Sequence, residues 1–258
     1  LGYIYQPRLA LLHLLQLPEN TAVFLEKDDD LDFVDGDGGK SLVSLKHKAA
    51  GDRLTDLSTD FWKSVNIWLA RYKRDGRVAS NLRFFLFTTA TVSASSILAR
   101  LLPNQALTSG DAATLTDLAD AALAESTSKI ITPIAAAFNE LSDPEKQDFL
   151  ERILILDGSP RIDDIPALIR DNHMRSVRRE HREFVYERLE GWWIDAVIKQ
   201  LTGAKPEGIF GYEVSDKLSS FAEEYKADTL PITCRGKVPA DEIDTDTDPR
   251  LFVAQLRE

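Results

Sequence analysis

Three residues near the N-terminus have the types and spacing of a metal-dependent phosphodiesterase site. Asp32 lies in one short apolar run, and Ser44 and Lys46 end another. Residues two apart on a strand share a face, so Ser44 and Lys46 point together while Leu45 points into the core. A carboxylate can hold Mg²⁺, and a nearby lysine can orient water and offset charge on a phosphate. The spacing therefore predicts Asp32 as a metal ligand and Lys46 as the catalytic lysine.

Two neighbouring carboxylates offer alternatives to this ligand set. Glu26 ends the preceding apolar run, and a glutamate can reach about one strand spacing, roughly 4.8 Å, so it is a second candidate metal ligand. If the strand register is shifted by two residues, Asp30 takes the place of Asp32. Without such a shift, Asp28, Asp29 and Asp30 are all interpreted as turn residues.

The elements that position these residues follow the order α-β-β-β-α-β. Proline is tolerated in a first helical turn, so Pro7 opens a helix that stops at Pro18. The Asp- and Gly-rich turn at 35–39 joins two strands into a hairpin. The predicted segments are a helix at 7–17, strands at 21–25, 31–34 and 41–46, a helix at 59–75 and a strand at 82–88.

The remainder of the chain is predicted to be almost wholly helical. Ser142 and Glu145 form a capping box, which predicts a helix running to about Leu156. Ser, Thr, Gly and Asn accumulate in 93–110, so we expect a core of residues 1–95 and a helical extension of residues 96–258 packed on it. The other predicted helices lie at 112–124, 130–141, from 163 onward, at 182–201 and at 214–225.

Several segments together resemble a known family. They are Gly2-Tyr3-Ile4-Tyr5-Gln6, Glu26 through Asp32, Ser44-Leu45-Lys46-His47-Lys48, Leu54-Thr55-Asp56, Phe61-Trp62-Lys63, Trp68, Glu190-Gly191-Trp192-Trp193, Leu230-Pro231-Ile232 and Phe252 through Leu256. They resemble the PD-(D/E)xK endonuclease effector domain at the N-terminus of bacterial anti-phage defence proteins, including CBASS effectors and Avs-type STAND NTPases. The resemblance covers most of the chain and is strongest in residues 2–70.

This resemblance implies a restriction-endonuclease-like fold, an α/β class, and magnesium-dependent cleavage of double-stranded DNA switched on by assembly of the full-length protein. It also implies that Gln6 lies near the active site, because the first helix packs beside it in this fold; helix capping is the alternative role. The family usually carries Glu, Asp or Gln where this chain has Ser44. Losing such a partner of a metal costs about 10–100-fold, so we expect a weakened or inactive site.

Two other readings stay open. The chain could be a catalytically degenerate module that kept the nuclease fold for DNA binding or oligomer assembly, which Ser44 makes plausible. The helical half could also act as a sensor that binds an activating ligand or a phage protein, because nothing in residues 110–258 identifies a ligand.

Composition and charge limit the remaining possibilities. The net charge of −11 argues against a surface that binds nucleic acid broadly, although it allows a local basic groove. A single cysteine, Cys234, excludes an internal disulfide and fits a reducing cytoplasm, and no apolar run approaches the roughly 20 residues of a membrane span. The histidines lack metal-ligand spacing, so a zinc site is not expected.

The first residue, Leu1, and the helix-like end at 252–258 suggest a segment of a longer protein.

One basic run is ambiguous. Arg175, Arg178, Arg179 and Arg182 recur at helical spacing, with Glu180 and Glu183 among them. They could follow a phosphate backbone, or they could form a solvated helix face held by salt bridges, which we take as the simpler expectation.

Overall fold

The computed structural model describes residues 2–103 and 109–225, with the backbone alone at residues 2, 3 and 109–114. Predictions on Cys234, on segment 230–232 and on the C-terminal end lie outside the described residues. The described residues up to 222 form one compact unit, and residues 223–225 fall in a second. The first unit contains the candidate site.

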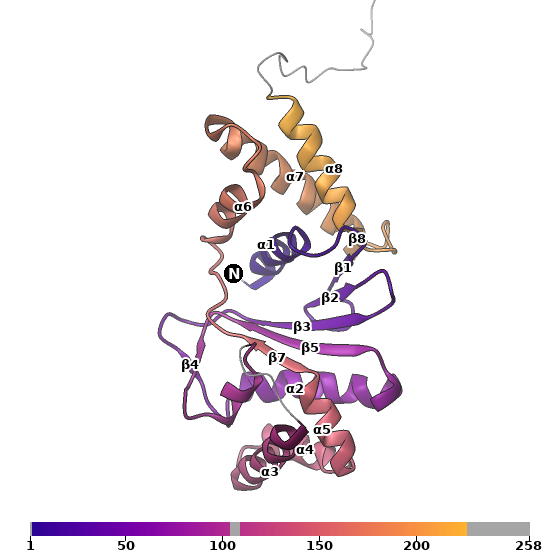
Figure 1. Ribbon diagram of the computed structural model, residues 1–258, viewed down its shortest axis with the longest axis vertical. Helices are drawn as coiled ribbons and strands as arrows, with labels where there is room; N and C mark the ends of the chain where they lie inside the picture. The colour runs from indigo at the N-terminus through magenta and orange to yellow at the C-terminus, as the bar shows by residue number, and fades with distance from the viewer. Residues whose placement is uncertain (1, 104–108, 226–258) are drawn as a thin grey trace, which may run out of the picture. The chain divides into compact units, whose positions relative to one another are not determined.

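A six-stranded mixed sheet forms the centre of this unit, with the strand order β7-β5-β3-β2-β1-β8 (Figure 1). The pairings are antiparallel from β8 through β1 and β2 to β3, and parallel from β3 through β5 to β7. The strands are β1 (Ala22–Leu25), β2 (Leu31–Val34), β3 (Lys40–Lys46), β5 (Leu82–Thr88), β7 (Ile153–Leu156) and β8 (Ile209–Phe210). Two short strands, β4 (Arg53–Leu54) and β6 (Thr91–Val92), pair separately.

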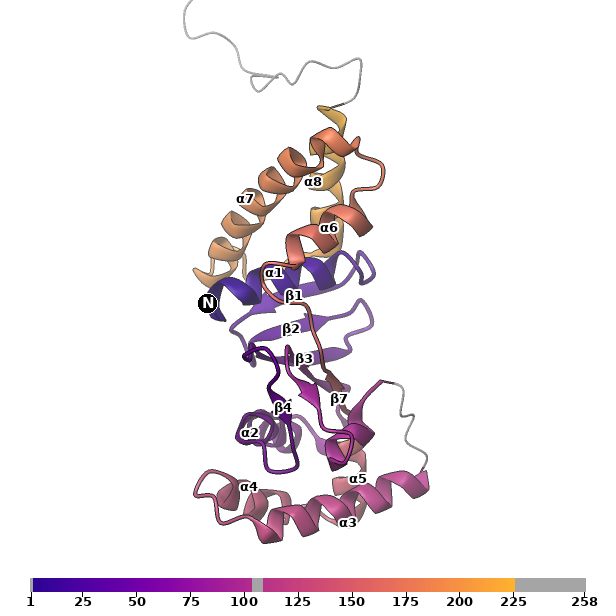
Figure 2. The ribbon, with the colours of Figure 1, turned by 90° about the vertical axis from the view of Figure 1, so that its left-hand side faces the viewer.

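Helices cover both faces of the sheet, as Figures 1 and 2 show. On one side lie α1 (Gly2–Leu14), α6 (Ile165–His173) and α7 (Arg182–Leu201). On the other side lie α2 (Thr59–Arg74), α3 (Ser109–Glu125), α4 (Ile131–Phe138) and α5 (Asp143–Glu151). The described residues also contain helix α8 (Gly211–Glu223) and the short 3₁₀ turns η1 (Arg77–Ala79), η2 (Ile97–Leu101) and η3 (Arg179–His181).

Helix α2 packs on the sheet because one of its faces is apolar at helical spacing. Phe61, Val65, Trp68 and Tyr72 are at most 1% exposed, and each fully buried side chain of this kind contributes about 1.5–3 kcal/mol. The Trp68 ring stacks on Phe84 of β5 with centroids 5.6 Å apart. This contact fixes α2 beneath β3 and β5, the strands that carry and flank the candidate site.

Helix α1 is held on the opposite face by contacts with α7. The indole nitrogen of Trp193 donates to the carbonyl of Pro7 at 2.7 Å, and Arg8 Nε donates to Glu190 at 2.6 Å. These two bonds join residues far apart in the sequence, so the C-terminal helices position the helix that carries Gln6.

The expected order α-β-β-β-α-β is confirmed by α1, β1, β2, β3, α2 and β5, and the mixed α/β class is confirmed with it. The prediction of a helix to Leu156 was wrong: α5 ends at Glu151 and residues 153–156 form strand β7, which pairs with β5. Strand β8 was also missed, so the sheet has six strands rather than four. Among the described residues, no helix combines the length and apolarity that crossing a membrane requires.

Candidate active site

Asp30 lies where α1 meets the β2–β3 hairpin. One carboxylate oxygen accepts a hydrogen bond from Gln6 Nε2 at 3.0 Å, and the other accepts one from the backbone N–H of Leu45 at 2.6 Å. The Asp30 side chain is 25% exposed and the Lys46 side chain 23% exposed, so solvent and a substrate can reach both. Asp30 therefore connects the first helix to the strand that carries the predicted catalytic lysine.

Lys46 and Ser44 interact directly on the same face of β3. Lys46 Nζ donates to Ser44 Oγ at 2.8 Å and lies 3.9 Å from Asp30 Oδ2. Ser64 of α2 also donates to Ser44 Oγ at 2.8 Å. The structure thus brings together three of the predicted site residues, Gln6, Ser44 and Lys46, with the alternative acid Asp30.

Asp32 lies deeper in the sheet, within a separate ion-pair cluster. Its side chain is 0% exposed, and Lys40 Nζ lies 2.8 Å from its Oδ2. Lys40 and Arg71 also pair with Asp28. Burial raises the pKa of Asp32, although the hydrogen bond from Lys40 opposes that rise. No contact links Asp32 to Lys46 in the part of the chain that the structure describes.

Glu26 is likewise outside this group of residues. It is exposed, its backbone adopts a left-handed conformation with φ of 53°, and its N–H donates to the carbonyl of Asp30 at 3.1 Å. Within residues 2–103 and 109–225, its carboxylate makes no hydrogen bond or ion pair. The structure does not bring Glu26 to Ser44 or Lys46.

Asp29 is a half-buried carboxylate next to the site. Its oxygens accept hydrogen bonds from Trp68 Nε1 at 2.6 Å and from the Asp30 N–H at 2.9 Å. Burial raises the pKa of Asp29 to about 6, although these two hydrogen bonds oppose that rise. Asp28 and Asp29 lie in the bend between β1 and β2, as expected for that segment, and their carboxylates also anchor α2.

Sequence reasoning did not identify Ser64 as a member of the site. Ser64 is 1% exposed and donates to Ser44, and it also lies 3.1 Å from the carbonyl of Asp60. The sequence does indicate that Ser64 faces the sheet, because it stands four residues before Trp68 and so lies on the same inner face of α2.

The donor set allows Mg²⁺ with a single protein carboxylate. Among the described residues, no three His, Cys, Asp or Glu side chains converge on one point. An ionised carboxylate has about four lone-pair positions, and the hydrogen bonds from Gln6 and Leu45 occupy two of those on Asp30. Mg²⁺ is usually held by one or two carboxylates, with water and substrate phosphate completing its coordination. The site offers one accessible carboxylate, Asp30, which is the smaller of these two numbers.

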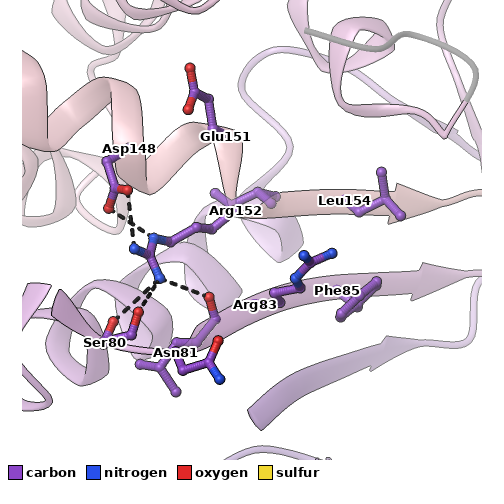
Figure 3. Close-up of a pocket in the computed structure, with 10 residues that line it drawn as sticks. Ser80, Asn81, Arg83, Phe85, Asp148, Glu151, Arg152 and Leu154 are labelled. Atoms are coloured by element: carbon purple, nitrogen blue, oxygen red, sulfur yellow. Dashed lines mark hydrogen bonds and ion pairs between the residues drawn. The ribbon is translucent and has the colours of Figure 1, made fainter. Parts of the chain in front are cut away.

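One hollow, shown in Figure 3, lies where β5 and β7 begin. Its volume is about 460 Å³, and Arg152 forms one wall. The guanidinium forms a two-bond pair with Asp148 at 2.8 and 3.0 Å and donates to the carbonyls of Ser80, Leu82 and Val78. With these partners Arg152 joins α5 and β7 to the start of β5, which is a structural role.

Another hollow, of about 410 Å³, is mainly apolar and lies between α1 and the sheet. His13 lines it, with its ring 4.5 Å from the Phe87 ring between centroids. Burial lowers the pKa of His13 to about 4, although a hydrogen bond with Gln16 opposes that fall. His13 is therefore neutral at physiological pH.

No family model and no curated protein sequence matches the chain. Among solved structures, the Cap4 SAVED/CARF-domain containing receptor of Moraxella osloensis is 16% identical with a TM-score of 0.48, over 87% of this chain and 48% of that chain. The Acinetobacter baumannii Cap4 SAVED/CARF-domain containing receptor is 12% identical with a TM-score of 0.49, over 87% and 47%. The same receptor with the cyclic trinucleotide 3'3'3'-cAAA is 13% identical with a TM-score of 0.48, over 87% and 46%.

The chain spans about half the length of these solved chains. At such identities and TM-scores, the similarity carries no conclusion about the activity, ligand or partners of this chain.

Proposed function

We propose that this chain contains a magnesium-dependent endonuclease domain that cleaves double-stranded DNA. The observation that carries the proposal is that the accessible carboxylate of Asp30 and the accessible ammonium of Lys46 lie 3.9 Å apart at the end of a hairpin. Hydrogen bonds from Gln6 and the Leu45 N–H hold the carboxylate, and a hydrogen bond to Ser44 holds the ammonium. The order of elements around this group, α-β-β-β-α-β, supports the same proposal. Asp30 takes the metal-ligand role that the sequence offered first to Asp32.

Each side chain has a definite part in the proposed reaction. Gln6 and the Leu45 N–H hold both oxygens of Asp30, which fixes the carboxylate that would bind Mg²⁺. When bound, Mg²⁺ supplies Lewis-acid activation of water and of the phosphate. Ser44 holds Lys46 Nζ beside Asp30, where the ammonium can orient water and offset negative charge on the phosphate.

The broader role we propose is anti-phage defence, with cleavage switched on when the full-length protein assembles. The support is the sequence resemblance in residues 2–70 together with the net charge of −11, which makes DNA binding by one copy weak. Assembly would present several copies of the site to one duplex and raise the effective concentration of DNA at each.

The direct test is incubation of the full-length protein with supercoiled plasmid and Mg²⁺, over protein concentrations that span its self-association. Lys46→Ala should lower the cleavage rate by about 100-fold or more, because the ammonium is the one cation within reach of Asp30 in the described site. Lys217→Ala, which removes the same charge from an exposed position on α8, is the control. Both variants should assemble and unfold as the parent does.

Ser44 supports a second candidate function, a degenerate nuclease fold that binds DNA or drives assembly without cleavage. The hydroxyl is neutral, 1% exposed and bonded to both Lys46 and Ser64, so it offers a metal little. If the assembled parent protein binds the plasmid and leaves it intact with Mg²⁺ or Mn²⁺, this second function replaces the first.

A further inference from the structure

Residues 174–182, the connection between α6 and α7 together with the first residue of α7, carry four arginines and one glutamate. The arginines recur at helical spacing, but the structure shows a loop followed by the 3₁₀ turn η3. The expected helix face held by salt bridges to Glu180 and Glu183 is therefore absent from this described segment. Glu183 pairs instead with Arg170 of α6.

Two buried side chains and one arginine fix the shape of this loop. Met174 is 0% exposed and Val177 5% exposed, so both point inward. Arg182 donates to the carbonyls of Val177 at 3.1 Å and Arg175 at 3.3 Å, which ties the two ends of the loop together. The Val177 N–H donates to the carbonyl of Met174 at 3.1 Å. The loop is thus held in one conformation while its other side chains face outward.

Beside Ser176 and Glu180, the outward residues are three arginines, Arg175, Arg178 and Arg179. All three are exposed, and in the part of the chain that the structure describes none forms an ion pair with a carboxylate. Arg175 donates only to the backbone carbonyl of Asp171. Near the end of α2, by contrast, Lys73 pairs with Glu140, and Arg77 of η1 pairs with Glu145.

We propose that Arg175, Arg178 and Arg179 form a contact surface for the phosphate backbone of duplex DNA, separate from the Asp30–Lys46 site. Arginine suits this partner because its planar fork donates two parallel hydrogen bonds to a phosphate and is weakly hydrated. Fixing the loop beforehand lowers the entropy lost on binding. In a chain of net charge −11, a local concentration of unpaired arginines is where a polyanion is attracted.

The position of the loop fits this role. In Figure 1 the α6–α7 connection and β4, which follows β3 and Lys46, both lie toward the left, the side that faces the viewer in Figure 2. A duplex at the Lys46 end of β3 would approach from that side. The inference rests on the proposed function for its choice of duplex DNA, and it adds a surface that acts on binding rather than on cleavage.

The test measures binding of the 258-residue protein to a fluorescent 30-base-pair duplex, by anisotropy in EDTA, over a series of salt concentrations. Arg175→Gln, Arg178→Gln and Arg179→Gln together should reduce the slope of log affinity against log salt by roughly 2 to 3, since each phosphate contact contributes about 0.9. At about 100 mM salt the affinity should fall roughly 10- to 100-fold.

The matched control is Arg74→Gln, Arg77→Gln and Lys199→Gln, which removes three exposed cations that already pair with carboxylates. It makes the same change in net charge and should keep most of the affinity and slope. Equal losses in the two triple variants, no duplex binding by the parent, or competition by polyglutamate as effective as unlabelled duplex would each overturn the proposal.

These outcomes are separable from a failure of the nuclease function. Lys217→Ala, which removes one exposed charge on α8 away from both sites, should bind the duplex in EDTA as the parent does. If the parent binds through the three arginines but never cleaves with Mg²⁺, the surface stands and the nuclease proposal fails. If the parent cleaves and the loop variant binds as well as its control, the surface alone fails.

Discussion

Lys46 Nζ donates a 2.8 Å hydrogen bond to the hydroxyl of Ser44, two residues earlier on the same strand. Ser64 donates to that hydroxyl from the neighbouring helix at 2.8 Å. A carboxylate at position 44 would accept both bonds and would place a second negative charge near Asp30. The residue at position 44 therefore sets how much negative charge the site offers to a divalent cation.

The first prediction follows from this position. Ser44→Asp should tighten Mg²⁺ binding by about 10–100-fold, because it adds a carboxylate beside Asp30. Aspartate is preferred to glutamate for a first test, since Ser44 is 1% exposed and a longer side chain overpacks the space against Ser64. Isothermal titration calorimetry measures the binding, and plasmid cleavage should rise in parallel.

Ser41→Asp is the control for this prediction. Ser41 lies on the same strand, paired with Phe33, but three positions from Ser44 and therefore on the opposite face. It should leave Mg²⁺ affinity unchanged. Equal affinities in the parent and in Ser44→Asp, with both proteins folded, would place Ser44 outside the metal site.

The second prediction concerns which aspartate binds the metal. Asp30→Asn should weaken Mg²⁺ binding about tenfold or more, because Asp30 is the accessible carboxylate near Lys46. Asp32→Asn should leave Mg²⁺ affinity nearly unchanged and alter stability instead, since Asp32 is fully buried against Lys40. Glu26→Ala should change neither quantity. Calorimetric titration together with urea unfolding separates these effects, and a loss of affinity only in Asp32→Asn would reverse the assignment.

The difficulty of choosing between Asp30 and Asp32 from the sequence has a physical origin. Strand alternation determines which face a side chain occupies, and positions two apart share that face. What distinguishes them is the point at which pairing starts: β2 begins at Leu31, which pairs with Val43, and Asp30 precedes it. That point depends on the bend at 26–30 and on α1, which reaches Asp30 through Gln6.

Strand β7 shows a similar limit. Residues 153–156 are four apolar residues directly after a helix with a clear capping box, so local pattern alone extends the helix through them. Only pairing with β5, about seventy residues earlier in the chain, makes the segment a strand. The core order α-β-β-β-α-β was predictable because β1, β2 and β3 pair with their immediate neighbours in the sequence, and α2 carries a clear helical repeat of apolar residues.

The third prediction is that Arg152 maintains the fold. Arg152→Ala should lower the free energy of unfolding by about 2–4 kcal/mol, because it leaves Asp148 with only the Tyr72 hydroxyl as donor and removes a donor from three backbone carbonyls. Arg152→Lys should recover only part of this loss, since one ammonium cannot reproduce the planar fork. Urea denaturation measures both. Arg77→Ala, which breaks an exposed pair with Glu145, should have a smaller effect, and a fully stable Arg152→Lys would contradict the role.

The fourth prediction concerns acid sensitivity caused by His13. Burial lowers its pKa in the folded protein to about 4 from its ordinary value of 6.5. The unfolded chain therefore binds a proton below about pH 6.5 that the folded protein does not bind until about pH 4. Stability is highest above pH 6.5 and falls as the pH drops through this window, by up to about 3 kcal/mol from this residue.

His13→Leu removes the titrating group and keeps an apolar contact with Phe87. Because carboxylates titrate in both proteins, the informative quantity is the difference in unfolding free energy between parent and variant. That difference should move in favour of the variant as the pH falls from 6.5 to 4 and should be constant between pH 7 and 8. If the difference in unfolding free energy stays constant down to pH 4, His13 is protonated equally in the folded and unfolded states, and the prediction is wrong. An NMR titration of the His13 ring would then give a pKa near 6.5.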